Sequence, residues 1–114
     1  MTDLQALITR LEQAEEGSRE LDAEISRALG METDTSQETA RQRFVGLWRP
    51  VPFYTLSLDA ALPGEVIISS IWLSDENRWR VENLAEDGNW FAYAKTEILA
   101  RRLAALKAMA DEPR

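Results

Sequence analysis

The stretch EVIISSIWLSDENRWRVENLAEDGNWFAY, Glu65–Tyr93, decides the fold of this chain. Residues 65–73 form a run rich in β-branched side chains that is too short for an obvious helix, so it predicts a strand at the centre of a sheet. A turn at Ser74–Asn77 follows, and residues 78–82 then alternate between polar and apolar side chains, like a strand with one wet face. After an Asp-Gly turn signal, residues 90–93 give a third strand. We therefore predict a three-stranded antiparallel meander.

Helical patterns flank the meander on both sides. After it, Thr96 is a typical N-cap of a helix with an inner apolar stripe. The stripe consists of Leu99, Leu103 and Leu106, widened by Ile98, Ala105 and Met109. Before the meander, a short helical segment is expected at 58–62, ended by Pro63-Gly64. Residues 54–110 are thus expected to form a helix–meander–helix core.

The N-terminal residues 1–30 have the pattern of a helical hairpin. Apolar side chains recur at helical spacing in two stripes, and Ser18 is a typical N-cap of the second helix, which should end at Gly30. The stripes are Leu4, Leu7, Ile8 and Leu11, then Leu21, Ile25, Ala28 and Leu29. Residues 31–53 are expected to be a loop and an extended connector, with capping-box spacing that favours a short helix near 36–44.

The order of these elements indicates an α+β fold in one globular domain. Because the run 65–73 is apolar on both sides of the predicted strand, both faces of the meander should need cover. We therefore expect helices on each face of the sheet, in an α/β/α sandwich-like arrangement.

The composition excludes several kinds of chemistry. The chain has 114 residues with no Cys and no His, which removes disulfides, thiol nucleophiles, imidazole catalysis and the usual zinc sites. It contains no nucleophile elbow and no phosphate-binding glycine loop. We therefore expect a protein that is not an enzyme, with no catalytic residue, no cofactor and no metal ligand.

Two acidic pairs in predicted turns, Asp75-Glu76 and Glu86-Asp87, offer the oxygen ligands that Ca²⁺ or Mg²⁺ prefers, should the fold bring them together. Turn chemistry explains the same residues without a metal, and we favour that interpretation.

The sequence shows no address for export or for a membrane. No stretch approaches the roughly 18 consecutive apolar residues of a membrane span. Residues 1–20 also lack the basic-then-apolar layout of a secretory signal. We expect a cytoplasmic protein of a bacterial host cell.

Several motifs point to a family. They are the run YTLSLDAAL at 54–62, the tryptophans Trp79 and Trp90, and the helix sequence AKTEILARRLAAL at 94–106. With them, residues 54–109 resemble the phage ABA sandwich domain, and the first helix is similar to the leader of many prophage reading frames. The resemblance implies a helix–sheet–helix sandwich encoded by a phage or prophage, and it assigns no activity and no catalytic residue.

Two groups of residues are candidates for binding a partner. The net charge is −7, and carboxylates are frequent in the N-terminal helices, where they could imitate nucleic-acid phosphates or bind a basic partner. These candidates are Glu15, Glu16, Glu20, Asp22 and Glu24. The alternative is that they line the solvated faces of two amphipathic helices. Trp48 and Arg49 form the second group, since both residue types anchor interfaces, whereas Trp79 and Trp90 are expected in the core.

These observations favour a small acidic phage or prophage accessory protein that binds a host or phage protein, for example as an anti-CRISPR or anti-restriction inhibitor of host defence. Two alternatives stay open. One is a module similar to double-stranded-RNA-binding domains, which would use Lys95, Arg101, Arg102 and Lys107 and is opposed by the negative net charge. The other is a structural phage protein that associates with itself.

Overall fold

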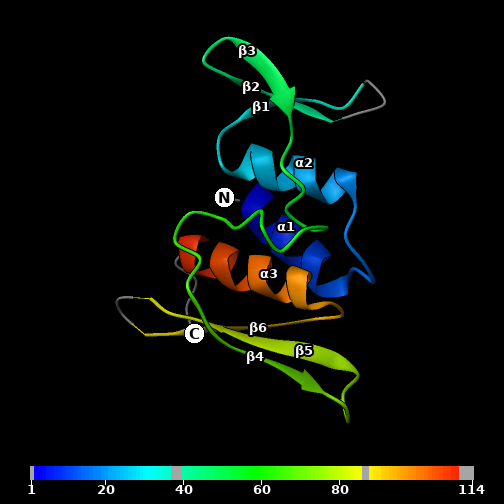
Figure 1. The fold of residues 1–114 in the computed structure, drawn as a ribbon, viewed down its shortest axis with the longest axis vertical. Coiled ribbons are helices and arrows are strands. Elements are labelled where there is room, and N and C mark those ends of the chain that lie inside the picture. The colour runs from blue at the N-terminus through cyan, green and yellow to red at the C-terminus, as the bar shows by residue number, and fades with distance from the viewer. Residues whose placement is uncertain (1, 37–39, 86–87, 111–114) are drawn as a thin grey trace.

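The α+β class predicted from the sequence is confirmed by a computed structural model, which describes residues 2–36, 40–85 and 88–110. Over these residues the chain forms three helices and two three-stranded antiparallel sheets. Figure 1 shows the layers along the longest axis: a small sheet at one end, then the helices, then a larger sheet at the other end.

The predicted helical hairpin is confirmed by α1, Thr2–Gln13, and α2, Arg19–Ala28. The Ser18 side chain caps α2 by accepting a hydrogen bond from the Leu21 N–H at 3.1 Å. The apolar stripes of both helices face inward, where Leu11 and Ile25 are completely buried. In Figure 1, α2 lies next to the small sheet, and α1 packs against both α2 and the C-terminal helix.

The small sheet was not expected. It consists of β1, Glu32–Asp34, β2, Arg41–Phe44, and β3, Leu47–Pro50, in the order β1-β2-β3. The prediction of a loop and connector over 31–53 is thus wrong for these three segments. A helix near 36–44 is also wrong for 40–44, while 37–39 lie outside the described residues. Strand pairing with β3 outweighs the weak helical propensity of this polar segment.

The larger sheet confirms the predicted meander with β4, Ile67–Leu73, β5, Arg78–Asn83, and β6, Trp90–Ala94. Its order is β4-β5-β6, so the apolar first strand lies at an edge of the sheet, and the prediction of a central position is wrong. The reason is topological, because the second strand of a three-stranded meander is the one paired on both sides.

Helices cover one face of this sheet. The C-terminal helix α3, Glu97–Ala110, packs across β5 and β6 with α1 beside it, and it confirms the helix predicted to start at Thr96. Val81 and Ala92 are completely buried beneath the helices, whereas Ile71 and Phe91 are exposed on the other face. Among the described residues, helices therefore cover one face of this sheet and not both faces, contrary to the prediction. The outward side of β5 is polar and needs no such cover.

Two further predictions differ from the structure, one in the connecting segment 51–66 and one in α3. In place of the predicted short helix at 58–62, residues 58–59 lie in a turn and residues 60–62 have no regular secondary structure. Met109 is exposed and does not widen the inner stripe of α3, whereas Leu99, Leu103 and Leu106 are completely buried as predicted. Trp90 is buried and Trp79 packs against the core, as expected for both. No helix in the described ranges is both long and apolar enough to cross a membrane.

Candidate protein-binding surfaces

The fold separates the acidic residues that were predicted to form one docking surface. Glu15, Glu16 and Glu20 are exposed where α1 connects to α2. Glu24 is only partly exposed and forms an ion pair with Arg10 of α1. The available acidic surface is therefore smaller than the sequence suggests.

The prediction that Asp22 belongs to a docking surface is wrong, because its side chain is completely buried. Its Oδ1 accepts hydrogen bonds from the backbone N–H of Thr55 at 2.7 Å and from the Thr55 hydroxyl at 2.6 Å. Its Oδ2 accepts one from Arg19 Nη1 at 2.7 Å. A buried carboxylate needs such partners to offset its desolvation. Asp22 therefore fastens segment 51–66 to α2 and is not available to a partner.

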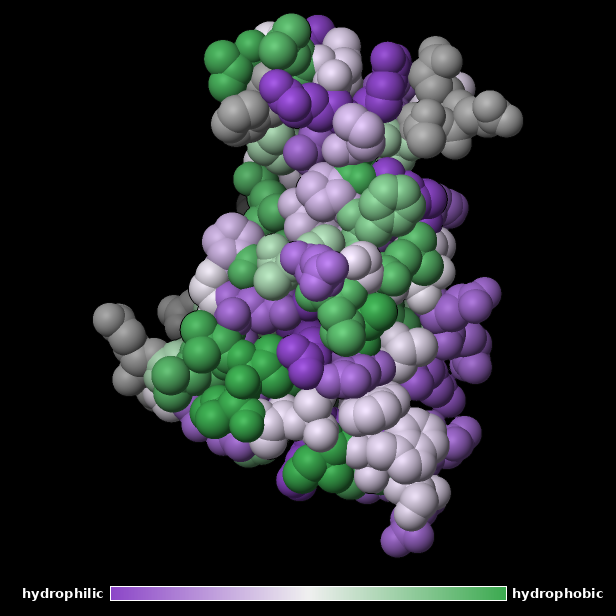
Figure 2. Space-filling model, in the orientation of Figure 1, coloured by the Kyte–Doolittle hydropathy of each residue, from purple (hydrophilic) through white to green (hydrophobic). Residues whose placement is uncertain are grey.

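The β2–β3 hairpin forms the end of the molecule opposite the larger sheet (Figure 1). Its two-residue turn is Val45-Gly46, with φ angles of 51° and 77°, and it connects the paired residues Phe44 and Leu47. Val45 is 83% exposed and Leu47 is 59% exposed. Figure 2 shows apolar surface at this end beside hydrophilic side chains. A β-branched residue with positive φ is strained, so the turn holds an apolar side chain in solvent at a cost in energy.

Trp48 and Arg49 lie on β3 behind this turn. The guanidinium carbons of Arg41 and Arg43 lie 5.4 and 4.9 Å from the centroid of the Trp48 ring. Both arginines also pair with carboxylates of β1, the first with Asp34 and the second with Glu32. Arg49 is exposed and has no ion-pair partner within the described part of the chain. It is the cation of the small sheet whose charge is left for a partner.

Each of the four cations proposed for a nucleic-acid module forms an ion pair with a carboxylate of the protein. Their carboxylate partners come from four different parts of the chain. These pairs are Lys95–Glu15, Arg101–Glu97, Arg102–Glu65 and Lys107–Glu12. Hydrogen bonds from Arg101, helped by one from Ser70, hold the pKa of Glu97 below its ordinary value. These cations therefore do not form a free basic patch.

Arg102 is completely buried and acts as an anchor for the connecting segment. Its Nε donates to the Tyr54 carbonyl at 2.8 Å, and its Nη2 donates to the carbonyls of Ser57 and Leu58 at 2.7 and 2.9 Å. Burial lowers the pKa of Arg102, and the Glu65 carboxylate opposes that change. Burial also raises the pKa of Tyr54, reinforced by the negative charge of Asp22. These groups hold the connecting segment against α2 and α3.

One surface hollow formed by described residues is lined by charged side chains that already form ion pairs. Its volume is about 320 Å³, and it is lined by Glu12, Glu76, Arg78, Tyr93, Ala94 and Lys95. Arg78, for example, pairs with Glu76 at 2.5 Å. In the described ranges, no group of three or more acidic residues could hold a metal ion.

The acidic pair Asp75-Glu76 lies in the β4–β5 turn, at the end of the sheet opposite the β5–β6 connection. Glu86 and Asp87, which belong to that second connection, lie outside the described residues.

The burial of Asp22 and Arg102 could have been predicted from their spacing relative to the apolar residues of α2 and α3. Asp22 lies three residues before Ile25 and therefore falls on the same inward stripe of α2. Arg102 lies three residues after Leu99 and four before Leu106, on the inner stripe of α3. The hairpin also had a signal, since Val45-Gly46 stands between two apolar residues.

Comparison with protein-family models, with curated proteins and with solved structures gives no significant match to this chain.

Proposed function

We propose that this chain is a small accessory protein that acts by binding another protein and catalyses no reaction. The observation that carries the proposal is the exposed β2–β3 hairpin, where a strained turn presents Val45 beside Leu47. Folded proteins retain such local strain chiefly at sites of function. The paired cations, and the hollow lined by charged groups that already pair, support the choice of binding over catalysis.

The hairpin specifies the chemistry of its partner. Apolar and aromatic side chains next to an arginine make the usual centre of a protein interface. Val45 and Leu47 require an apolar pocket, while Arg49, exposed and unneutralised by the described residues, requires a carboxylate. Trp48 stays with its neighbouring arginines and shapes the base of the surface. The partner is thus a protein with an acidic rim around an apolar depression.

The acidic alternative has less support. Glu15, Glu16 and Glu20 remain exposed, but Glu15 pairs with Lys95, Asp22 is buried and Glu24 pairs with Arg10. An isolated group of exposed carboxylates also serves simply to keep a helical hairpin solvated.

The resemblance to the phage ABA sandwich domain supports a phage or prophage origin for the proposed module. Its partner would then be a host or phage protein in the bacterial cytoplasm. The most concrete form of this proposal is inhibition of a host-defence protein, such as a CRISPR effector or a restriction enzyme.

The test is an affinity capture from bacterial lysate with the tagged full-length chain, with and without nuclease treatment. We expect one protein to be retained in both samples, to be lost with Leu47→Asp and with Arg49→Glu, and to persist with Leu56→Asp. Leu56 is the control because it is a similarly exposed leucine on another segment. Circular dichroism must show that each variant is folded.

Other outcomes would assign binding to a different surface or contradict the proposed function. Loss of the partner only with the triple variant Glu15→Lys/Glu16→Lys/Glu20→Lys would assign binding to the acidic surface. Retention of nuclease-sensitive material alone would favour nucleic acid. If the wild-type chain retains no protein, the proposed function is wrong.

A further inference from the structure

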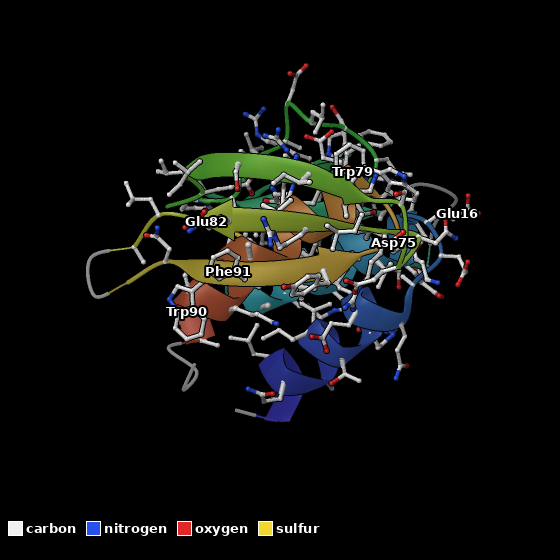
Figure 3. All side chains as sticks on the ribbon, turned by 90° about the horizontal axis from the view of Figure 1, so that it is seen from below. Glu16, Asp75, Trp79, Glu82, Trp90 and Phe91 are labelled. Carbon is white, nitrogen blue, oxygen red and sulfur yellow. The ribbon has the colours of Figure 1, made fainter. Side chains whose placement is uncertain are left out.

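The larger sheet has an outer face that no helix of the described chain covers. Strand register places eight side chains on this face: Ser69, Ile71 and Leu73 from β4, Arg78, Arg80 and Glu82 from β5, and Phe91 and Tyr93 from β6. Figure 3 views the sheet with this face toward the reader and the helices behind it, and Glu82 and Phe91 lie on neighbouring strands. Ile71 and Phe91 are 41% and 44% exposed.

Arg80 lies at the centre of the outer face, between Ile71 and Tyr93 in the register. Its guanidinium carbon is 5.9 Å from the Phe91 ring centroid. Its Nε is buried and has no hydrogen-bond partner, and no carboxylate of the described residues lies within ion-pair distance. Arg80 as a whole is half-buried, so the charge of its guanidinium can still be neutralised by a carboxylate from a second molecule.

The outer face carries a charge pattern that complements itself. Along β5 the cation of Arg80 is followed two residues later by the carboxylate of Glu82, and the β6 partners of these two residues are Tyr93 and Phe91. Glu82 already accepts a hydrogen bond from Asn89 at 2.7 Å, and its carboxylate retains further acceptor sites.

We infer that a second copy of this chain binds the outer face, with its β5 antiparallel to the first β5 across a two-fold axis at the level of Val81. This axis runs between the two sheets, across the strands. It places Arg80 of each copy against Glu82 of the other, and Tyr93 of each against Phe91 of the other, as a two-fold contact requires. Two ion pairs and two aromatic contacts therefore form together. The other two-fold arrangement, with parallel β5 strands, would place Arg80 against Arg80.

A second copy fits this face better than a nucleic acid does. Aromatic side chains beside arginine can also stack bases, but Glu82 lies among them and Arg78 is already neutralised by Glu76. The net charge of −7 further opposes phosphate binding. In the proposed dimer, each charge brought into the interface meets its opposite.

The test measures the mass of the full-length chain by sedimentation and light scattering from about 1 µM to about 1 mM. We expect the mass to rise toward twice the 13.0 kDa of one chain. Arg80→Glu alone and Glu82→Arg alone should each weaken dimerisation by about 100-fold or more, because each places like charges together. An equimolar mixture of these two variants should form a heterodimer, since each then supplies the charge that the other lacks.

The matched control is Arg49→Glu, which reverses the unpaired arginine of the small sheet and should leave the dimer unchanged. Circular dichroism confirms that the variants fold. A wild-type chain that keeps the mass of one copy throughout the concentration range would overturn the inference. Single variants that still dimerise, or a mixture that stays monomeric, would overturn the proposed two-fold contact.

Discussion

Arg102 and Glu65, which are 37 residues apart in the sequence, form an ion pair with an Nη1–Oε2 distance of 2.5 Å. Both side chains are almost completely buried, at 0% and 3% exposed. Because Arg102 also binds three backbone carbonyls, the pair fixes the connecting segment 51–66 against α3. This segment joins the two sheets, so the ion pair helps to set how they are placed around the helices.

Breaking the buried pair from one side should destabilise the protein strongly. For Arg102→Met we expect a loss of about 3–5 kcal/mol in the free energy of unfolding, since Glu65 and three carbonyls lose their partner. Urea denaturation measures the loss. The control is Arg101→Met, whose partly exposed pair with Glu97 is worth only about 0.3–0.5 kcal/mol. Equal losses for the two variants would contradict the structural role of Arg102.

Gly17 allows α2 and the connecting segment to approach closely. A Cβ at this position would lie 2.0 Å from the Thr55 carbonyl oxygen, so Gly17→Ala must displace backbone. We expect a loss of about 1–3 kcal/mol from overpacking, together with faster hydrogen exchange of the Thr55 amide, which donates to Asp22.

The control for this prediction is Gly64→Ala, where no atom lies within 4 Å but φ is 79°. Its cost should be about 1–2 kcal/mol from the left-handed backbone alone. The Thr55 amide should keep its protection in this variant. Unchanged exchange in Gly17→Ala would show that the close approach is not needed.

Asp34 of β1 should give the small sheet an acid-sensitive contact. Hydrogen bonds from the Ser36 hydroxyl and backbone N–H, followed by that of Arg41, lower the pKa of Asp34 to about 2. A carboxyl whose pKa is lower in the folded state stabilises that state when ionised. The contribution is therefore complete above about pH 4 and is lost as the pH falls toward 2.

Carbon-13 NMR of the Asp34 carboxyl tests this directly by giving its titration midpoint. Ser36→Ala should raise the midpoint, because it removes the hydroxyl that contributes most to the shift. Asp34→Asn should remove this part of the acid dependence of unfolding. A wild-type midpoint close to the ordinary value of about 3.9 would contradict the hydrogen-bonded geometry.

We predict that Val45 lowers the stability of the protein and contributes to binding of the proposed partner. Replacing it with glycine relieves the positive φ of 51°, and we expect a gain of about 1 kcal/mol in thermal unfolding measurements. The same change removes an exposed apolar side chain, so capture of the proposed partner should weaken. Leu56→Gly, at an exposed position with no such strain, should not raise stability. A Val45→Gly protein that is less stable would show that this turn is unstrained.

The elements with strong local signals could be predicted from the sequence. These signals depend on residues that lie close together in the chain, so they can be recognised before the fold is known. They are the apolar stripes of α1, α2 and α3, the caps at Ser18 and Thr96, and the alternation of polar and apolar residues in β5. The small sheet was missed because its strands are only three or four residues long, and because β1 and β2 are mostly polar. Arg41–Phe44 becomes a strand through pairing with Leu47–Pro50, and pairing leaves little trace in composition.

The candidate binding residues also divide into features that the sequence predicts and features that depend on the tertiary structure. The sequence by itself determined the absence of thiol and imidazole chemistry, the acidic net charge, and the choice of Trp48 and Arg49 as candidates. Only the tertiary structure decided which charges are available. It buried Asp22 and Arg102 by placing the connecting segment over them, and it left Arg80 and Arg49 without carboxylate partners in the described chain. Burial and ion pairing depend on which distant segments meet, and residue type alone does not specify that.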